Sequence, residues 1–315
     1  MIVLYSCVNR IICLWKYMAE NMELESFPLN RAINMSNTDR LETIKSTVCE
    51  ISLVSIWAVL GCLLRIGISD ETNFWPNLLG SFLITFTSTF LTDPESKDLG
   101  FFKTGFSTGF CGSLTTFSGW MLYTTKSYLD TESYVMSLIS NFAAFFLACQ
   151  VGNDLKKLLK EMKIAKISFY LNILLYLGLL SFEITALFFI FNGQPGWAKT
   201  TMHQLFLAQF GAVARWLLCK LNSKSKLPIG TLLCNTLGVL ILSLVDTFAG
   251  KTVWIDGLKT GFCSSLTTVS SFMNDILKLQ VGRKQSKSCF WLIYTYVSMT
   301  VGMGILITQL VVKLG

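Results

Sequence analysis

The chain has 315 residues, 52% of them hydrophobic and 14% charged, and its mean hydropathy is +0.54. Soluble domains carry about 25% charged residues, so this composition excludes an ordinary soluble domain and predicts an integral membrane protein. The net charge of +7 comes from basic loops and requires no nucleic-acid partner. Ten cysteines without a CxxC pair, a single histidine and no phosphate-binding glycine motif predict no metal cluster, no nucleotide site and no enzymatic activity.

Hydropathy predicts nine transmembrane helices of about 20 residues each, long enough to cross the hydrocarbon core. They lie near residues 51–69, 74–92, 100–125, 133–152, 167–191, 202–221, 228–248, 254–278 and 289–312. Residues 1–50 mix acids, bases and short apolar stretches, and we interpret them as a cytosolic N-terminal tail.

The lysines and arginines outside these helices lie mostly on one side of the predicted arrangement. Nineteen of them fall in the N-terminal tail and in the loops after the second, fourth, sixth and eighth helices, and five fall on the other side. Positively charged loops stay in the cytosol. We therefore expect a cytosolic N-terminus and, with nine helices, an extracellular C-terminus.

One segment of the chain occurs twice. Residues 105–120 read GFSTGFCGSLTTFSGW and residues 257–272 read GLKTGFCSSLTTVSSF, with ten of the sixteen positions identical. Each copy lies in an apolar span, and its glycines and hydroxyls predict a break in the helix. The duplication predicts a first four-span repeat (51–153), a linker with the fifth helix (154–201) and a second four-span repeat (202–315). Because one helix separates them, the second repeat is expected to insert upside down, with the functional site where the repeats meet.

Two further pairs of residues recur in both repeats. Arg65 and Arg215 lie at equivalent positions in the first span of each repeat, which favours an orienting or anion-attracting role over simple contact with lipid headgroups. Asn77 and Asn235 each precede a glycine by three residues in the second span. Each asparagine places a carboxamide with two N–H donors inside the membrane.

The fourth span of each repeat carries hydroxyl groups. Tyr134, Ser137 and Ser140 are spaced three apart on one helical face, and Tyr294 and Thr300 are their nearest counterparts in the other repeat. Hydroxyls bonded to their own helix backbone remain an alternative interpretation for each of these residues.

Carboxylates are expected to be absent from the middle of the spans in both repeats. Glu183, in the fifth helix, is the only mid-span acid that the hydropathy pattern predicts. The remaining polar groups are N–H and O–H donors, and the edge of an aromatic ring is also positive. Donors without carboxylates suit an anion.

These features together resemble one known family. The segment GFCGSLTTFS, the Asn-x-x-Gly span before it, the early Gly61-x-x-x-Arg65 and the two repeats joined by one helix are similar to the fluoride channels of the Fluc/FEX family. The two-repeat form of that family is the eukaryotic fluoride exporter, and the resemblance covers about residues 51–313. It implies an all-α polytopic protein of the plasma membrane that conducts fluoride passively and works as a single chain, an internal pseudo-dimer.

The resemblance also implies a set of functional residues. The implied fluoride pathways are lined by Asn77, Asn235, Thr116, Phe117, Ser118, Thr268, Ser270 and Phe272, together with Tyr134, Ser137, Ser140, Tyr294 and Thr300. A central structural sodium ion is implied at the two breaks, held by backbone carbonyls near Gly112, Ser113, Thr115, Ser264, Ser265 and Thr267.

The phenylalanine box of the family, Phe-x-x-Phe, is altered in both repeats. It reads Phe117-x-x-Trp120 in the first and Val269-x-x-Phe272 in the second. The resemblance pairs the first box residue of one repeat with the second box residue of the other. One pathway would then keep both phenylalanines, and we expect that pathway alone to conduct.

Two other function classes remain open. A proton-coupled exporter of small molecules or guanidinium, of the dual-topology type, also has four spans per unit. That class needs a buried glutamate in the first span of each repeat, where this chain has Arg65 and Arg215. A non-transporting membrane scaffold would not explain the paired intramembrane asparagines and threonines.

Overall fold

The computed structural model describes residues 37–87, 97–127, 131–158, 196–283 and 288–315. The chain forms two compact units, Met1–Val48 and Cys49–Gly315, and both copies of the duplicated segment lie in the second unit. All regular secondary structure in the described ranges is helical. The fifth predicted span, 167–191, lies outside the described residues.

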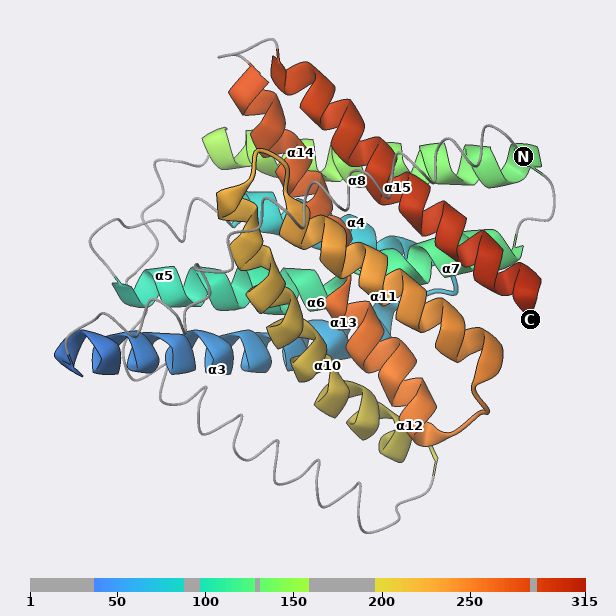
Figure 1. The fold of residues 1–315 in the computed structure, drawn as a ribbon, viewed down its shortest axis with the longest axis horizontal. Helices are drawn as coiled ribbons and strands as arrows, with labels where there is room; N and C mark the ends of the chain where they lie inside the picture. Colours follow the sequence, from blue (N-terminus) through green and yellow to red (C-terminus); the bar gives the residue numbers. More distant parts are fainter. Residues whose placement is uncertain (1–36, 88–96, 128–130, 159–195, 284–287) are drawn as a thin grey trace. The chain divides into compact units, whose positions relative to one another are not determined.

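The helices occur in the same order in the two halves of the second unit. The first half contains the part of α3 (Asn37–Ile68) from Cys49 onward, followed by α4 (Phe74–Phe86), α5 (Lys97–Thr104), η3 (Gly105–Cys111), α6 (Gly112–Leu114), α7 (Phe117–Ser127) and α8 (Thr131–Leu158). The second half contains α10 (Trp197–Cys219), η4 (Lys220–Lys224), α11 (Ile229–Phe248), α12 (Val253–Asp256), η5 (Gly257–Cys263), α13 (Ser264–Leu266), α14 (Val269–Arg283) and α15 (Ser288–Leu314). In Figure 1 the long helices α3 and α8 run across the view, whereas α10, α11 and α15 run diagonally.

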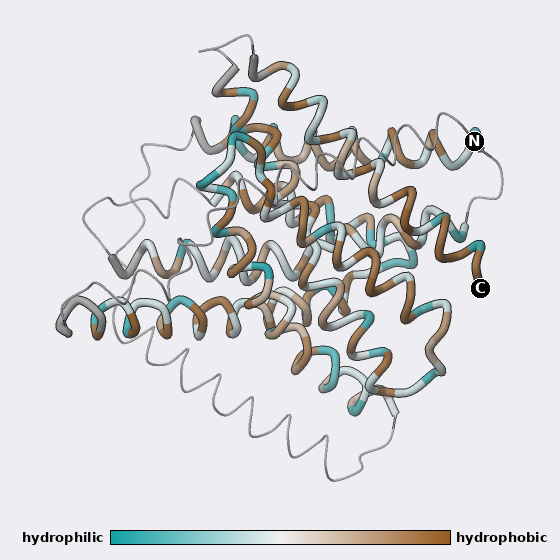
Figure 2. Tube along the Cα trace, viewed as in Figure 1, coloured by the Kyte–Doolittle hydropathy of each residue, from teal (hydrophilic) through white to brown (hydrophobic). Residues whose placement is uncertain are grey.

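Four of the described helices are long and apolar enough to cross a membrane. They are Leu41–Ile68, Glu132–Leu155, Ile229–Phe248 and Phe290–Leu314, and Phe74–Phe86 is a shorter apolar helix. Hydrophobic stretches run along α11 and α15 in Figure 2. The chain is therefore a helical membrane protein, as its composition predicts.

Each duplicated segment contains a real break, but the glycines do not form it. The glycine-rich parts, η3 and η5, are π-helices, a form that often marks functional sites. One α-helical turn follows, and the backbone then becomes extended at Thr115 (φ −94°, ψ 150°) and at Thr267 (φ −88°, ψ 159°). New helices begin at Phe117 and Val269. The threonine pairs, rather than the glycines, are where the helices are interrupted.

Close backbone packing holds the first helix of each half against the π-helix. A Cβ atom added at Gly61 would overlap the carbonyl oxygen of Phe110, and one added at Gly211 would overlap that of Phe262. Only glycine permits this approach. The Gly-x-x-x-Arg spacing then places each arginine one helical turn beyond the contact, facing the break.

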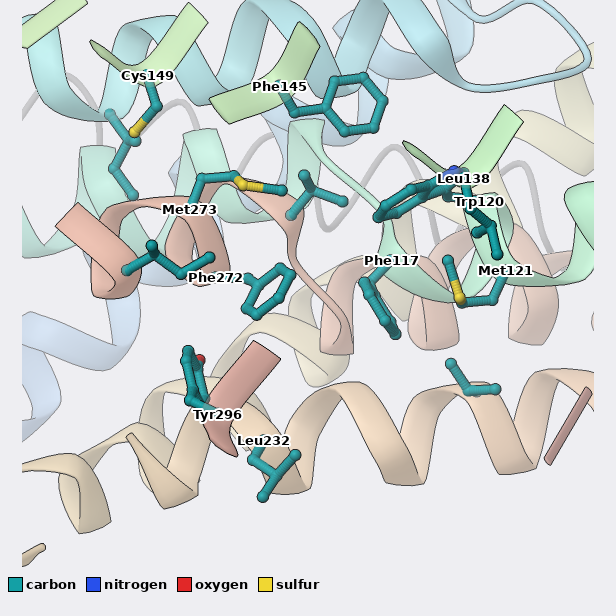
Figure 3. Packing of buried hydrophobic residues seen from close by; sticks show 14 of the residues in the cluster. Phe117, Trp120, Met121, Leu138, Phe145, Cys149, Leu232, Phe272, Met273 and Tyr296 are labelled. Carbon is teal, nitrogen blue, oxygen red and sulfur yellow. The ribbon is translucent and has the colours of Figure 1, made fainter. Parts of the chain in front are cut away.

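The helix after each break packs against the other half of the protein. Helix α7 contacts α11 and α15, and α14 contacts α4 and α8. The buried apolar cluster between them includes Phe117, Trp120, Phe145, Phe272 and Tyr296 (Figure 3). Both halves therefore contribute side chains to one core, and the two boxes lie within it.

Candidate functional site

The two breaks lie against each other and are joined by hydroxyl groups. The Thr115 hydroxyl lies 3.2 Å from that of Thr268 and 3.1 Å from that of Ser270. In the equivalent contact, the Thr267 hydroxyl lies 3.4 Å from that of Thr116 and 3.0 Å from that of Ser118. All six side chains are buried. The structure thus brings four of the predicted pathway hydroxyls, those of Thr116, Ser118, Thr268 and Ser270, into one cluster at the junction of the halves.

Each break also caps the helix that follows the other break. The backbone N–H groups of Val269 and Ser270, at the start of α14, donate to the Thr115 hydroxyl at 3.2 Å. The N–H of Ser118, at the start of α7, donates to the Thr267 hydroxyl at 3.2 Å. The first N–H groups of a helix have no partner within it, so these threonines satisfy donors that would otherwise be buried and unpaired.

The two predicted asparagines hold the backbone of the breaks. The Asn77 carboxamide accepts from the Thr116 N–H at 2.8 Å and donates to the Thr116 carbonyl at 3.2 Å. Asn235 makes the same two bonds with Thr268, at 2.8 and 3.2 Å. The amide nitrogen of each asparagine has two N–H groups, and one is used here. The second N–H is the group that could bind an anion.

The intact phenylalanines of the two boxes are in direct contact. Phe117 and Phe272 meet edge to face, with ring centroids 5.9 Å apart and planes at 76° (Figure 3). Phe272 also meets Tyr296 edge to face at 5.4 Å, and Phe117 meets Trp120 at 5.7 Å. Val269 is buried in the same cluster, but its side chain has no aromatic ring and so no positive ring edge.

Helix α15 presents a polar stripe to these rings, but it differs from the one predicted. Tyr294 is 55% exposed, whereas Tyr296 and Thr300 are buried. Tyr296, Thr300, Gly304 and Thr308 are spaced four apart, so they share one face. The predicted Tyr294 is two residues away from Tyr296, which turns it by about half a circle to the opposite face. Tyr296 therefore occupies the position expected for Tyr294.

Helix α8 divides its predicted hydroxyls between two environments. Tyr134 is buried in the core that contains the boxes. Ser137 and Ser140 border a separate hollow of about 530 Å³ that also contains Asp70. The Ser140 hydroxyl donates to the carbonyl of Ser137 in its own helix at 3.2 Å. The Thr300 hydroxyl likewise donates to the Tyr296 carbonyl of its own helix at 2.8 Å. Both Ser140 and Thr300 therefore have the geometry of the alternative interpretation, a hydroxyl bonded to its own helix backbone.

Both predicted arginines are buried beside the breaks. Arg65 donates to the carbonyls of Ser113 and Thr260. Arg215 donates to those of Ser265 and Thr108 in the equivalent way. Each guanidinium thus joins its own repeat to the other one, which is the orienting part of the predicted role.

Arg65 faces an open cavity of about 280 Å³, lined also by Asn73, Lys259 and Thr260. Lys259 and Lys126 both pair with Asp246. The residues that line this cavity thus include two basic side chains, Arg65 and Lys259, the second of them paired with Asp246.

The carbonyls implied as sodium ligands are already in use. Arg215 donates to the carbonyls of Gly112 at 2.9 Å and Thr267 at 3.2 Å, in addition to that of Ser265. Arg65 occupies the carbonyl of Ser113. Four of the six expected ligands therefore face a guanidinium. A sodium ion needs oxygens free of other cations, so the described residues do not fit one at this place.

A buried carboxylate lies near the end of the eighth predicted span, outside the middle region from which acids were expected to be absent. Asp275, one turn beyond Phe272, is 7% exposed. It accepts hydrogen bonds from the Thr231 hydroxyl at 2.8 Å and the Tyr296 hydroxyl at 3.4 Å, and pairs with Lys278 at 3.5 Å. Hydropathy places Asp275 near the end of its span, and its burial comes from tertiary packing. The sequence signal for this burial was the spacing of three residues between Phe272 and Asp275, which puts both side chains on the same side of the helix.

The fold and site together define a duplicated helical membrane protein with two interlocked helix breaks. The chain matches the family of CrcB-like proteins (Camphor Resistance, CrcB) over residues 52–153 and again over 202–310. The chain belongs to that family, and the family model matches each half of the chain separately. This confirms the family expected from the resemblance.

Curated relatives carry more specific names. The chain is 27% identical to Fluoride export protein 1 of Candida albicans over 71% of its own length and 64% of that protein, so it spans less than two thirds of the fungal relative. It is 34% identical to the fluoride-specific ion channel FluC 1 of Streptococcus pneumoniae over 31% of this chain and 90% of that protein. It is also 42% identical to FluC 1 of Yersinia pestis over 22% of this chain and 60% of that protein. No solved structure matches the chain.

Proposed function

We propose that this protein is a passive fluoride-selective channel that exports fluoride from the cytosol across the plasma membrane. The single observation that carries the proposal is the edge-to-face pair of Phe117 and Phe272, buried beside hydroxyls and carboxamides from both halves. The names of the relatives, fluoride export protein and fluoride-specific ion channel, support the same ion.

The chemistry of these groups suits fluoride. A pore for a small, strongly hydrated anion must replace the hydrogen bonds of water with several fixed donors and still release the ion. The second N–H of each asparagine carboxamide, which has no hydrogen bond within the described part of the chain, is such a donor. The hydroxyl cluster and the positive ring edges are others. We propose that one pathway runs past Phe117 and Phe272 along the stripe of α15 that begins at Tyr296.

Export needs no coupled ion. Hydrogen fluoride crosses membranes from acidic surroundings and dissociates in the neutral cytosol. A negative-inside potential then drives the anion outward, by about 2.3 kcal/mol per unit charge for each 100 mV. A channel that only opens a selective path therefore acts as an exporter.

We further propose that the two halves are inverted repeats within nine transmembrane helices, with a cytosolic N-terminus. The matching order of helices in both halves and the two separate family matches support this arrangement. One further helix between the repeats, in 154–201, reverses the second relative to the first, and a single chain then supplies both halves of the site.

This topology predicts the side on which the C-terminus lies. An epitope placed after Gly315 should bind antibody on intact cells without permeabilisation, because nine helices put that end outside. An epitope within 159–166 should be labelled only after permeabilisation. Labelling of both epitopes on the same side would mean an even number of helices between residue 166 and Gly315, and would rule out the inverted arrangement.

A proton-coupled exporter remains the second candidate, and Asp275 is the observation that favours it. A buried carboxylate in a membrane span is typical of proton and cation relays. Against this class, the described part of α3 within the membrane carries Arg65 in place of a buried glutamate.

Fluoride release from loaded liposomes separates the candidates. For the channel, we expect a fluoride electrode to record rapid release when valinomycin sets a potassium potential, with equal pH and equal sodium on both sides. Release that requires a pH gradient would identify the coupled exporter. Release no faster than from protein-free liposomes would reject the channel and leave an exporter of other molecules or the membrane scaffold.

A further inference from the structure

The two breaks expose carbonyl groups at the junction of the halves, and one side chain links them. The last carbonyls of a helix have no partner within it and form the negative end of its dipole, which attracts cations. Nη1 of Arg215 lies 2.9 Å from the Gly112 carbonyl of one break and 3.2 Å from the Thr267 carbonyl of the other. Nη2 of the same guanidinium lies 3.4 Å from the Ser113 hydroxyl. One group therefore binds both breaks at once.

We infer that the guanidinium of Arg215 is the central cation of this protein and takes the place that a sodium ion would otherwise fill. An arginine side chain stays charged and offers five N–H donors in a fixed plane. Arg215 is fully buried and forms no ion pair with the residues that the structure describes. The carbonyls of the breaks are what stabilise its charge, so a sodium ion would have to displace it.

A difference between the repeats explains why Arg215, and not Arg65, reaches the centre. A Cβ atom added at Gly112 would overlap the Arg215 guanidinium. The equivalent residue of the second repeat is Ser264, whose side chain is present and donates to the Lys259 carbonyl at 3.2 Å. Arg65 bonds to the Ser113 and Thr260 carbonyls but, in the described part of the chain, makes no bond to Ser264. The glycine at 112 is the space into which one guanidinium fits.

The inference predicts how the protein responds to sodium. Purified wild-type protein should unfold at the same temperature in sodium chloride and in N-methylglucamine chloride. In Arg215→Ala the carbonyls become free, and sodium should then raise the unfolding temperature. A ligand at about a hundredfold excess over its Kd shifts the unfolding of a domain of this size by several degrees. Gly112→Ala, which pushes the guanidinium out, should gain the same response if Arg215→Ala does not fold.

Ser264→Ala is the matched control, because it changes the equivalent position without touching Arg215. It should remain as indifferent to sodium as the wild type. Stabilisation of the wild type by sodium would overturn the inference. So would indifference to sodium in whichever of Arg215→Ala and Gly112→Ala folds. Because the readout is unfolding, its failure would leave the proposed fluoride conduction unaffected.

Discussion

Phe117→Ile and Phe272→Ile should each reduce fluoride efflux from loaded liposomes by about tenfold or more. The two rings meet edge to face at 5.9 Å, at the junction of the halves. Isoleucine fills much of the space but has no positive edge to face an anion. A loss of about 1.4 kcal/mol of stabilisation along the path lowers a rate tenfold.

Two control variants make this result specific. Phe210→Ile repeats the chemical change on a ring that is 52% exposed and should leave efflux unchanged. Val269→Ala alters the box position that lacks a ring, and its efflux should stay close to that of the wild type once protein amounts are matched. Trp120→Leu, which the altered boxes also suggest, is less specific because Trp120 packs against Phe117. Equal losses in Val269→Ala and Phe117→Ile would indicate that both pathways conduct, or that the boxes pair differently.

Asn77→Asp or Asn235→Asp, whichever of the two lies on the conducting pathway, should abolish protection against fluoride in cells that depend on this protein. Each asparagine donates to the carbonyl of a break threonine and accepts from its N–H. Aspartate keeps the acceptor, loses both N–H donors and places a negative charge beside the anion path. A buried carbonyl left without its donor costs about 1–3 kcal/mol, and a charge nearby costs more. The measurement is growth on fluoride medium with expression checked by immunoblot.

Asn141→Asp provides the comparison for these two variants. Asn141 is partly exposed and lines the hollow that contains Asp70, apart from the breaks. The substitution should leave growth on fluoride close to normal. Full protection by both Asn77→Asp and Asn235→Asp, at normal expression, would remove the asparagines from the pathway.

The sequence predicts the elements that recur and misses those that depend on packing. The duplication identified the break segments, the arginines and the asparagines, because each pair stands at equivalent positions in both halves. Spacing by three favoured Tyr294, whereas α15 places its buried face at Tyr296, Thr300 and Thr308, spaced by four. Hydropathy could not reveal that Asp275 is covered by Thr231 and Tyr296, since those contacts join residues from three different helices.

The two arginines show most clearly which features a sequence pattern cannot predict. Their recurrence predicts a role at the site, but not which group each guanidinium would bind. That depends on the close approach of α3 and α10 to the π-helices at Gly61 and Gly211, which directs the side chains to the breaks. The absence of a Cβ at Gly112 then decides between two arginines that are equivalent in sequence.

If fluoride crosses the protein passively and without a coupled ion, the reversal potential of the fluoride current reveals it. The purified chain is placed in a planar bilayer with a fluoride gradient, and the voltage of zero current is read while pH and sodium are varied on one side. We expect a current that reverses at the Nernst potential of fluoride whatever the pH or sodium gradient. A reversal potential that moves with the pH gradient, or a bilayer that carries no fluoride current with the protein present, would contradict it.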